Sequence, residues 1–114
     1  MKENRDALYL ERIIESIDRA EGFVAGVDFD EFASNEMMQD ATSMQLINIG
    51  EMVSRLSEEF RDKHDYLPWH KVIGMRNQIA HGYFEIKADE VWRTCEEDLP
   101  KLKEQLLKSN LDLL

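Results

Sequence analysis

Hydrophobic residues recur along this chain every three or four positions, which is the spacing of one buried face of an α-helix. The first such stretch runs from about Arg5 to Glu21, and Gly22 and Gly26 mark its end. Its apolar stripe consists of Leu10, Ile13, Ile14 and Ile17. We therefore expect a first helix that buries one side against the core.

The longest amphipathic stretch covers about 35–63 and carries two apolar stripes. The first is a near-heptad seam, which is typical of helices that pack along their whole length. Its members are Thr42, Leu46, Ile49, Val53, Leu56 and Phe60. The second stripe consists of Met37, Ala41, Met44 and Met52. Two apolar faces need two partners, so the second stripe belongs either inside the chain's own core or against a second subunit, where methionines adapt to the contact.

Two further helices are expected in the second half of the chain. Pro68 suits the first turn of a helix, and Gly82 permits the chain to leave that helix just after His81. The last helix begins near Ala88. Pro100 lies inside it and should kink or divide it, because proline lacks an N–H and its ring clashes with the preceding turn.

No stretch alternates apolar and polar residues with the period of two that marks a β-strand. The pattern as a whole predicts an all-α fold, an antiparallel bundle of four to five helices joined by short loops. With 114 residues, 43% of them hydrophobic and 33% charged, the chain suits a single domain over 1–114. We predict that the bundle forms a homodimer through the long central helix, about a two-fold axis.

Composition and charge exclude several classes of protein. The apolar runs fall far short of the roughly 20 residues that cross a bilayer, and the first residues lack the apolar core of a signal peptide. We therefore expect a cytoplasmic protein with no membrane partner. The net charge of −10 repels polyanions, but the segment 68–87 has three basic residues and one acidic residue, which gives +2. A positive patch of this size suits the binding of one phosphate group rather than a long stretch of nucleic-acid backbone.

Metal and cofactor chemistry finds little support in the sequence. It contains no glycine-rich phosphate loop and no HExxH motif. His64 and His70 are six residues apart without a third ligand at helical spacing, so we expect no metal and no cofactor. The single Cys95 cannot form an internal disulfide, and its helical surroundings favour a packed thiol over a reactive one. The many carboxylates are expected on solvated faces.

The stretch RNQIAHGY, residues 76–83, concentrates the groups that could perform chemistry. Arg76 is a permanent cation with a forked donor face, histidine titrates near neutrality, and Asn77 can orient its neighbours. On an ideal helix Arg76 and His81 lie about 140° apart, so they share a side only if the helix ends near His81. The same residues at a helix end also satisfy terminal carbonyls and pair with carboxylates, and the spacing leaves both interpretations open.

These groups match what RNA cleavage needs in the absence of a metal. A general base takes the proton of the 2′-hydroxyl, which attacks the adjacent phosphorus. A cation stabilises the charge on the phosphoryl oxygens, and an acid protonates the leaving 5′ oxygen. One arginine and one histidine per chain are only half of the groups that this reaction readily uses. A two-fold dimer would bring two of each to one cleft.

Three segments together resemble the HEPN superfamily, specifically its HepT-like branch. They are PWHKVIGMRNQIAHGYF, VWRTCEEDLPKLKEQL and QLINIGEMVSRLSEEFR, and the resemblance covers nearly the whole chain. The superfamily signature is an arginine and a polar residue followed a few residues later by a histidine. Here it is met by Arg76, Asn77 and His81, and the further tyrosine of the branch is met by Tyr83.

The resemblance implies a metal-independent endoribonuclease that acts as the toxin of a toxin–antitoxin pair. It implies that Arg76 stabilises phosphate, that His81 acts as acid or base, and that Asn77 orients them in a cleft shared by two protomers. The implied antitoxin is an MntA-like minimal nucleotidyltransferase that transfers AMP from ATP to Tyr83. AMPylation there would place bulk and negative charge beside the phosphate site and block RNA.

Two other functions compete with the nuclease. One is a non-catalytic HEPN binding module that presents Tyr83, or a nucleotide, to a partner nucleotidyltransferase. The other is a purely structural helical dimer. The acidity of the chain away from the motif fits either a nuclease with a small target or a member that binds its protein partner.

Overall fold

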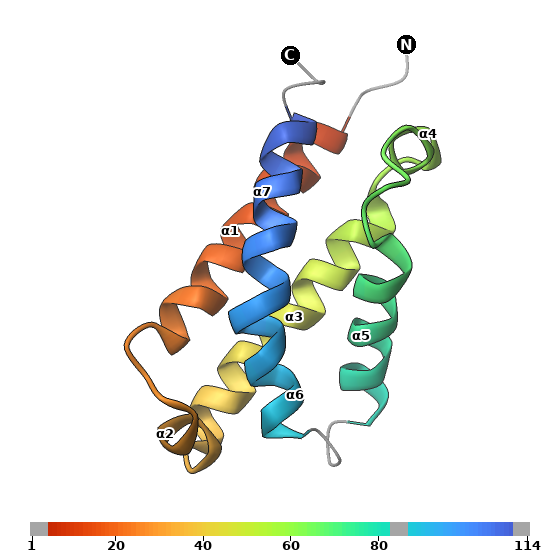
Figure 1. The fold of residues 1–114 in the computed structure, drawn as a ribbon. Helices are drawn as coiled ribbons and strands as arrows, with labels where there is room; N and C mark the ends of the chain where they lie inside the picture. The colour runs from red at the N-terminus through yellow and green to blue at the C-terminus, as the bar shows by residue number, and fades with distance from the viewer. Residues whose placement is uncertain (1–4, 83–86, 111–114) are drawn as a thin grey trace.

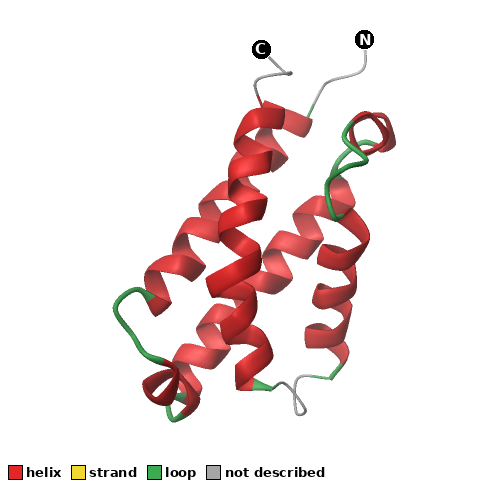
Figure 2. Cartoon of the chain, viewed as in Figure 1, coloured by secondary structure: helices red, strands yellow, loops and turns green. Residues whose placement is uncertain are grey.

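Four long helical segments form an up-down-up-down bundle in the computed structural model, which describes residues 5–82 and 87–110 (Figure 1). They are α1 (Asp6–Val24), α3 (Glu36–Arg55), α5 (Trp69–His81) and a last segment made of α6 (Ala88–Arg93), the π-helical turn η2 (Thr94–Asp98) and α7 (Leu99–Asn110). Two short helices, α2 (Phe29–Ala33) and α4 (Glu58–Lys63), form corners. Figure 2 shows helices and loops and no strand in these ranges, so the predicted all-α bundle is confirmed.

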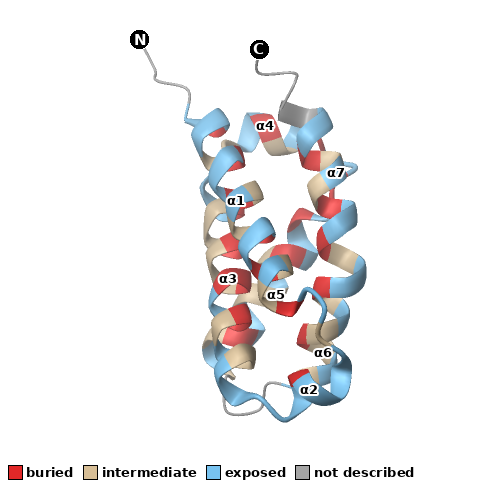
Figure 3. Ribbon diagram, turned by 90° about the vertical axis from the view of Figure 1, so that its left-hand side faces the viewer, coloured by how far each residue is buried: buried red, intermediate tan, exposed pale blue. Residues whose placement is uncertain are grey.

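The central helix of the bundle is α3, which packs against α1 on one side and α5 on the other. The last segment lies across this layer, with α7 against α1 and α6 against α3. All six residues of the near-heptad seam are at most 4% exposed. Figure 3 shows the buried positions gathered along the inner sides of the helices. Each large apolar side chain buried in this way contributes about 1.5–3 kcal/mol, so the seam is a major source of stability.

The helix predicted over 35–63 is in fact two helices, and the prediction was wrong at this point. α3 ends at Arg55, Leu56 is extended with a ψ of 144°, and the Ser57 hydroxyl caps α4 by accepting a backbone N–H at 3.0 Å. Asp6 accepts hydrogen bonds from the N–H of Ser57 at 2.8 Å and from its hydroxyl at 2.6 Å. These bonds replace those that a continuous helix would make, so the break costs little.

The other helix ends follow the sequence more closely. α1 continues to Val24, three residues beyond its expected end, because Gly22 is accommodated inside the helix. The chain then turns at Gly26, whose φ of 73° is in the left-handed region that favours glycine. α6 begins at Ala88 as expected.

Pro100 was expected to kink or divide the last helix, and the segment is divided. The interruption is the π-helical turn Thr94–Asp98, which lies just ahead of Pro100 rather than at it. A π turn widens the helix before a residue that has no N–H to donate and whose ring crowds the preceding turn. The helical direction continues through the interruption into α7 (Figure 1).

α3 and α5 lie in close contact at Gly50. A Cβ atom at this position would overlap the Cβ and Cγ atoms of Arg76 and would lie 3.4 Å from the carbonyl oxygen of Val72. Glycine costs a helix interior roughly 0.5–1 kcal/mol relative to alanine, so its presence in the middle of α3 needs a reason. The close contact with α5 supplies that reason.

Replacing Gly50 with alanine should destabilise the fold by about 1–3 kcal/mol, because the added methyl group forces two packed backbones apart. Urea or thermal unfolding followed by circular dichroism measures this change. The matched control is Gly74→Ala on α5, where an added Cβ has no atom within 4 Å. The control should be neutral or stabilising by up to about 1 kcal/mol, and equal effects of the two variants would contradict the close contact.

Candidate functional site

Arg76 lies on the side of α5 that faces α3, and its stem packs on Gly50. Its guanidinium forms an ion pair through Nη2 with Glu51 of α3, and Nη1 donates a hydrogen bond to Asn77 Oδ1 at 2.7 Å. The Nε atom is buried and bonds to no acceptor of the described residues. The side chain as a whole is 30% exposed. Protein groups therefore hold the guanidinium through both terminal nitrogens, while the side chain as a whole keeps some exposure to solvent.

His81 is the last residue of α5, and its side chain is exposed. The helix does not end before it, because the N–H of Gly82 still donates to the carbonyl of Gln78 at 3.0 Å. Arg76 and His81 are therefore about 140° apart around the helix axis. Within one chain the structure does not bring them to the same side of α5.

Asn77 is bonded to one of the two candidate catalytic residues, Arg76. Its amide oxygen accepts from Arg76, and it precedes His81 by four residues, which places it about 40° from that histidine around the helix. Asn77 thus contacts Arg76 through a hydrogen bond, and its role in orienting both residues stays a prediction. Tyr83, the fourth predicted site residue, lies outside the described residues.

The positive spot predicted over 68–87 is smaller in three dimensions than its charge count suggests. Arg76 is paired with Glu51, and Lys71 lies 3.5 Å from the carboxylate of Asp98 on η2. Both acidic partners come from other helices, so a count along one segment could not include them. The spot that a phosphate would meet is close to neutral until one of these pairs rearranges.

The sequence interpretation missed two residues of this site, Gly50 and Glu51. The carboxylates were expected on solvated faces, but Glu51 is 32% exposed and bonded to the candidate catalytic arginine. Asp6 is a second exception, since it is buried and bonded to Ser57. The available signal was a glycine in the middle of a strongly helical stretch, directly followed by an acid, which marks a close helix contact.

The second apolar stripe of α3 remains largely uncovered in the single chain. Met37 is 81% exposed and Met44 is 54% exposed, while Ala41 and Met52 are half-buried. The interpretation that placed this stripe inside the chain's own core is therefore wrong for Met37 and Met44, whereas Met52 packs against the core. Met37, Met44 and Glu51 are spaced by seven residues, so they follow one line along α3. The exposed methionines thus lead directly to the ion pair of Arg76.

The remaining histidines have different surroundings. His64 is buried, with Nδ1 3.0 Å from the carbonyl oxygen of Phe60 and its ring centroid 4.3 Å from the ring of Phe60. His70 is exposed on α5. Across residues 5–82 and 87–110, no three His, Cys, Asp or Glu side chains gather as a metal ion would require. None of the helices in this part of the chain combines the length and hydropathy of a membrane span.

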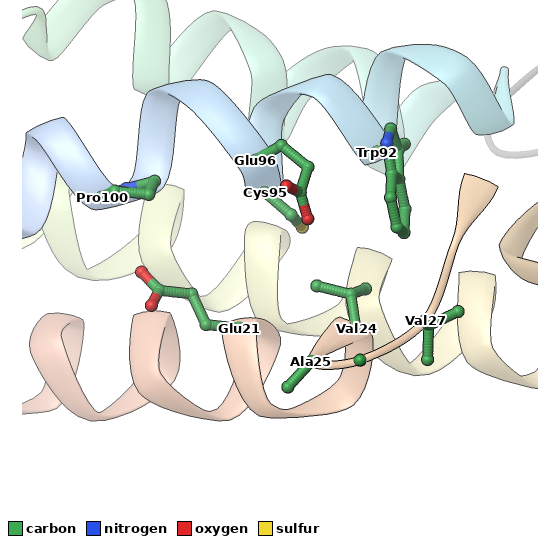
Figure 4. A pocket seen from close by; sticks show the side chains of 9 residues that line it. Glu21, Val24, Ala25, Val27, Trp92, Cys95, Glu96 and Pro100 are labelled. Atoms are coloured by element: carbon green, nitrogen blue, oxygen red, sulfur yellow. The ribbon is translucent and has the colours of Figure 1, made fainter.

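Cys95 lines a pocket of about 380 Å³ between the end of α1 and the last helical segment (Figure 4). Burial raises the pKa of its thiol to about 12, and the negative charges of Glu96 and Glu21 add to the effect. Such a thiol stays protonated near neutral pH and is a poor nucleophile. The expectation of a packed rather than a reactive thiol is confirmed by its burial.

A larger groove of about 1180 Å³ separates α5 from α6 and α7. Its floor is apolar and includes Leu46 and Ile79, and its rim carries both basic and acidic side chains. Neither Arg76 nor His81 is among the residues that line this groove, although Gly82, the neighbour of His81, is.

Comparison with known proteins gives a consistent family. The family model described as "Ribonuclease HepT-like" matches residues 13–109. A Thermococcus cleftensis protein named "Probable ribonuclease HepT" is 34% identical over 95 residues, which are 83% of this chain and 86% of that protein. A Caldanaerobacter subterraneus protein, named as an inferred RNase, is 34% identical over 98 residues, which are 86% of this chain and 88% of that protein.

A third relative is longer than this chain. It is a Methanocaldococcus jannaschii protein named as a gamma-glutamylcyclotransferase and an inferred RNase. It is 35% identical over 101 residues, which are 89% of this chain and 46% of that protein, so the chain spans about half its length. No solved structure matches the chain significantly.

Proposed function

This chain belongs to the HepT-like ribonuclease family, and we propose that it is a metal-independent endoribonuclease whose active site is shared by two copies of the chain. The observation that carries the proposal is the state of Arg76: its guanidinium is held by Asn77 and Glu51, and its side chain is still 30% exposed. A guanidinium presented in this way suits a phosphodiester, because its planar fork matches two phosphoryl oxygens.

The proposed reaction needs a base, an acid and a charge stabiliser. His81 of one copy takes the proton of the RNA 2′-hydroxyl, whose oxygen then bonds to the adjacent phosphorus. The bond from phosphorus to the 5′ oxygen breaks, and a second histidine protonates that oxygen. Arg76 stabilises the negative charge on the phosphoryl oxygens.

The need for a second copy follows from the geometry of α5. Arg76 and His81 of one chain lie on different sides of that helix, so one chain offers a phosphate the arginine or the histidine but not both. The exposed stripe of Met37 and Met44 leads along α3 to the ion pair of Arg76. We propose that two copies pair through this stripe and bring Arg76 of each toward His81 of the other.

Purified protein should cleave labelled RNA in the presence of EDTA. Arg76→Ala and His81→Ala should each lower the cleavage rate by about 100-fold or more, since each removes a charge stabiliser or a proton-transfer group. His70→Ala is the matched control, because His70 is also an exposed histidine of α5. It should cleave at the wild-type rate, and a wild-type chain that leaves RNA intact would contradict the proposal.

Replacing Met44 with glutamate should convert the dimer to a monomer of 13.4 kDa and should abolish cleavage, because a charge would be buried at the centre of the contact. Light scattering at micromolar concentration measures the mass. Leu107→Glu on α7 is the control, since Leu107 is another exposed apolar side chain, 47% exposed. A wild-type chain that is already monomeric would rule out this arrangement.

We further propose that the nuclease is the toxin of a toxin–antitoxin pair, silenced when an MntA-like nucleotidyltransferase attaches AMP to Tyr83. The support is the family and the sequence position of Tyr83, two residues after His81. An added phosphate there would repel the RNA backbone.

Co-expression with such a nucleotidyltransferase should add the mass of one or more AMP groups, located on Tyr83 by peptide mass spectrometry. Tyr83→Phe should remain unmodified and toxic in the same strain. Tyr66→Phe is the control for an exposed tyrosine elsewhere, as Tyr66 is 60% exposed. Modification of Tyr66 in place of Tyr83 would argue against the proposal that AMP on Tyr83 silences the nuclease.

The second candidate function is a non-catalytic module that presents Tyr83 or a nucleotide to the transferase. The net charge of −10 and the pairing of Arg76 with Glu51 favour it, because both weaken attraction for RNA. Harmless expression of the wild-type chain, together with AMP transfer to Tyr83, would support this module over the nuclease.

A further inference from the structure

We propose that Glu51 is a positioning residue for Arg76, which fixes the guanidinium so that its free N–H groups face an incoming phosphate. This inference rests on the proposed nuclease function. It starts from the ion pair between the two side chains, which joins α3 to α5. Both side chains are about one-third exposed, at 30% and 32%, so the pair lies at the edge of the helix contact.

The donors of Arg76 are only partly used by the part of the chain that the structure describes. A guanidinium has two N–H groups on each terminal nitrogen and one on Nε. Glu51 accepts from Nη2 and Asn77 accepts from Nη1, and the Nε atom is buried. Among the described residues no partner is seen for one N–H on each terminal nitrogen, and we infer that these two donate to a phosphodiester while both protein contacts persist.

Gly50 fixes the other end of the same side chain. The stem of Arg76 packs where any Cβ on Gly50 would lie, so the arginine leaves α5 directly over the backbone of α3. With its stem held by Gly50 and its head held by Glu51 and Asn77, the side chain has little freedom left. A cation that is pre-oriented in this way stabilises a transition state without reorganising during the reaction.

Glu51 should speed the chemical step and weaken the binding of RNA. Its negative charge repels RNA, so removing it strengthens RNA binding. Its carboxylate also holds the guanidinium in place, so removing it slows the chemical step. A residue that only stabilises the fold would not produce this split between kcat and KM.

The test compares steady-state RNA cleavage by the wild-type chain, Glu51→Ala, Glu51→Gln and Asp40→Ala. Asp40→Ala is the control, because it removes the same charge from an exposed position of α3. We expect Glu51→Ala to lower kcat by about tenfold or more with an unchanged or lower KM. Glu51→Gln keeps an acceptor and should retain more of kcat than Glu51→Ala, and the control should keep kcat. A kcat of Glu51→Ala at or above that of the wild type would overturn the inference.

A wild-type chain that does not cleave RNA would contradict the proposed function but not the positioning role of Glu51. A second measurement tests that role without RNA cleavage. The Nε–H signal of Arg76 in a ¹⁵N spectrum, identified by its loss in Arg76→Lys, should exchange slowly with solvent because Nε is buried. Glu51→Ala should speed this exchange by about tenfold or more, and Asp40→Ala should not. Unchanged exchange in Glu51→Ala would overturn the positioning role.

Discussion

The contact between Gly50 of α3 and Arg76 of α5 is the constraint on which the site depends. It places two helix backbones so close that no side chain fits at position 50, and it sets where the arginine stem leaves α5. Glu51 and Asn77 then determine where the guanidinium points. The same contact therefore ties the packing of the α3–α5 pair to the geometry of the candidate catalytic cation.

The placement of Arg76 and His81 around α5 is the reason for proposing a site shared by two chains. Helical geometry directs Arg76 toward α3 and leaves His81 on another side, exposed at the end of the helix. A second copy, joined through the methionine stripe of α3, is the simplest way to bring the two groups together. The large groove between α5 and α7 does not solve the problem, because neither residue lines it.

The sequence predicted those features that depend on local periodicity. The buried seam of α3 and the starts of α5 and α6 could be inferred because each is encoded within a few residues. The break after Arg55 could not, since it depends on Asp6, 51 residues from Ser57. Glu51 was missed for a related reason: helical periodicity indicates which face of a helix is buried, but not which residue of a neighbouring helix meets it.

The link between Asp6 and Ser57 has a consequence for how the chain acquires its shape. The corner between α3 and α4 is completed only when the first turn of α1 has docked, because the carboxylate of Asp6 accepts both donors of Ser57. Helix α3 rests on contacts that are local in sequence, as all helices do. The direction in which α4 departs, and with it the entry into α5, depends instead on a contact between residues 51 positions apart.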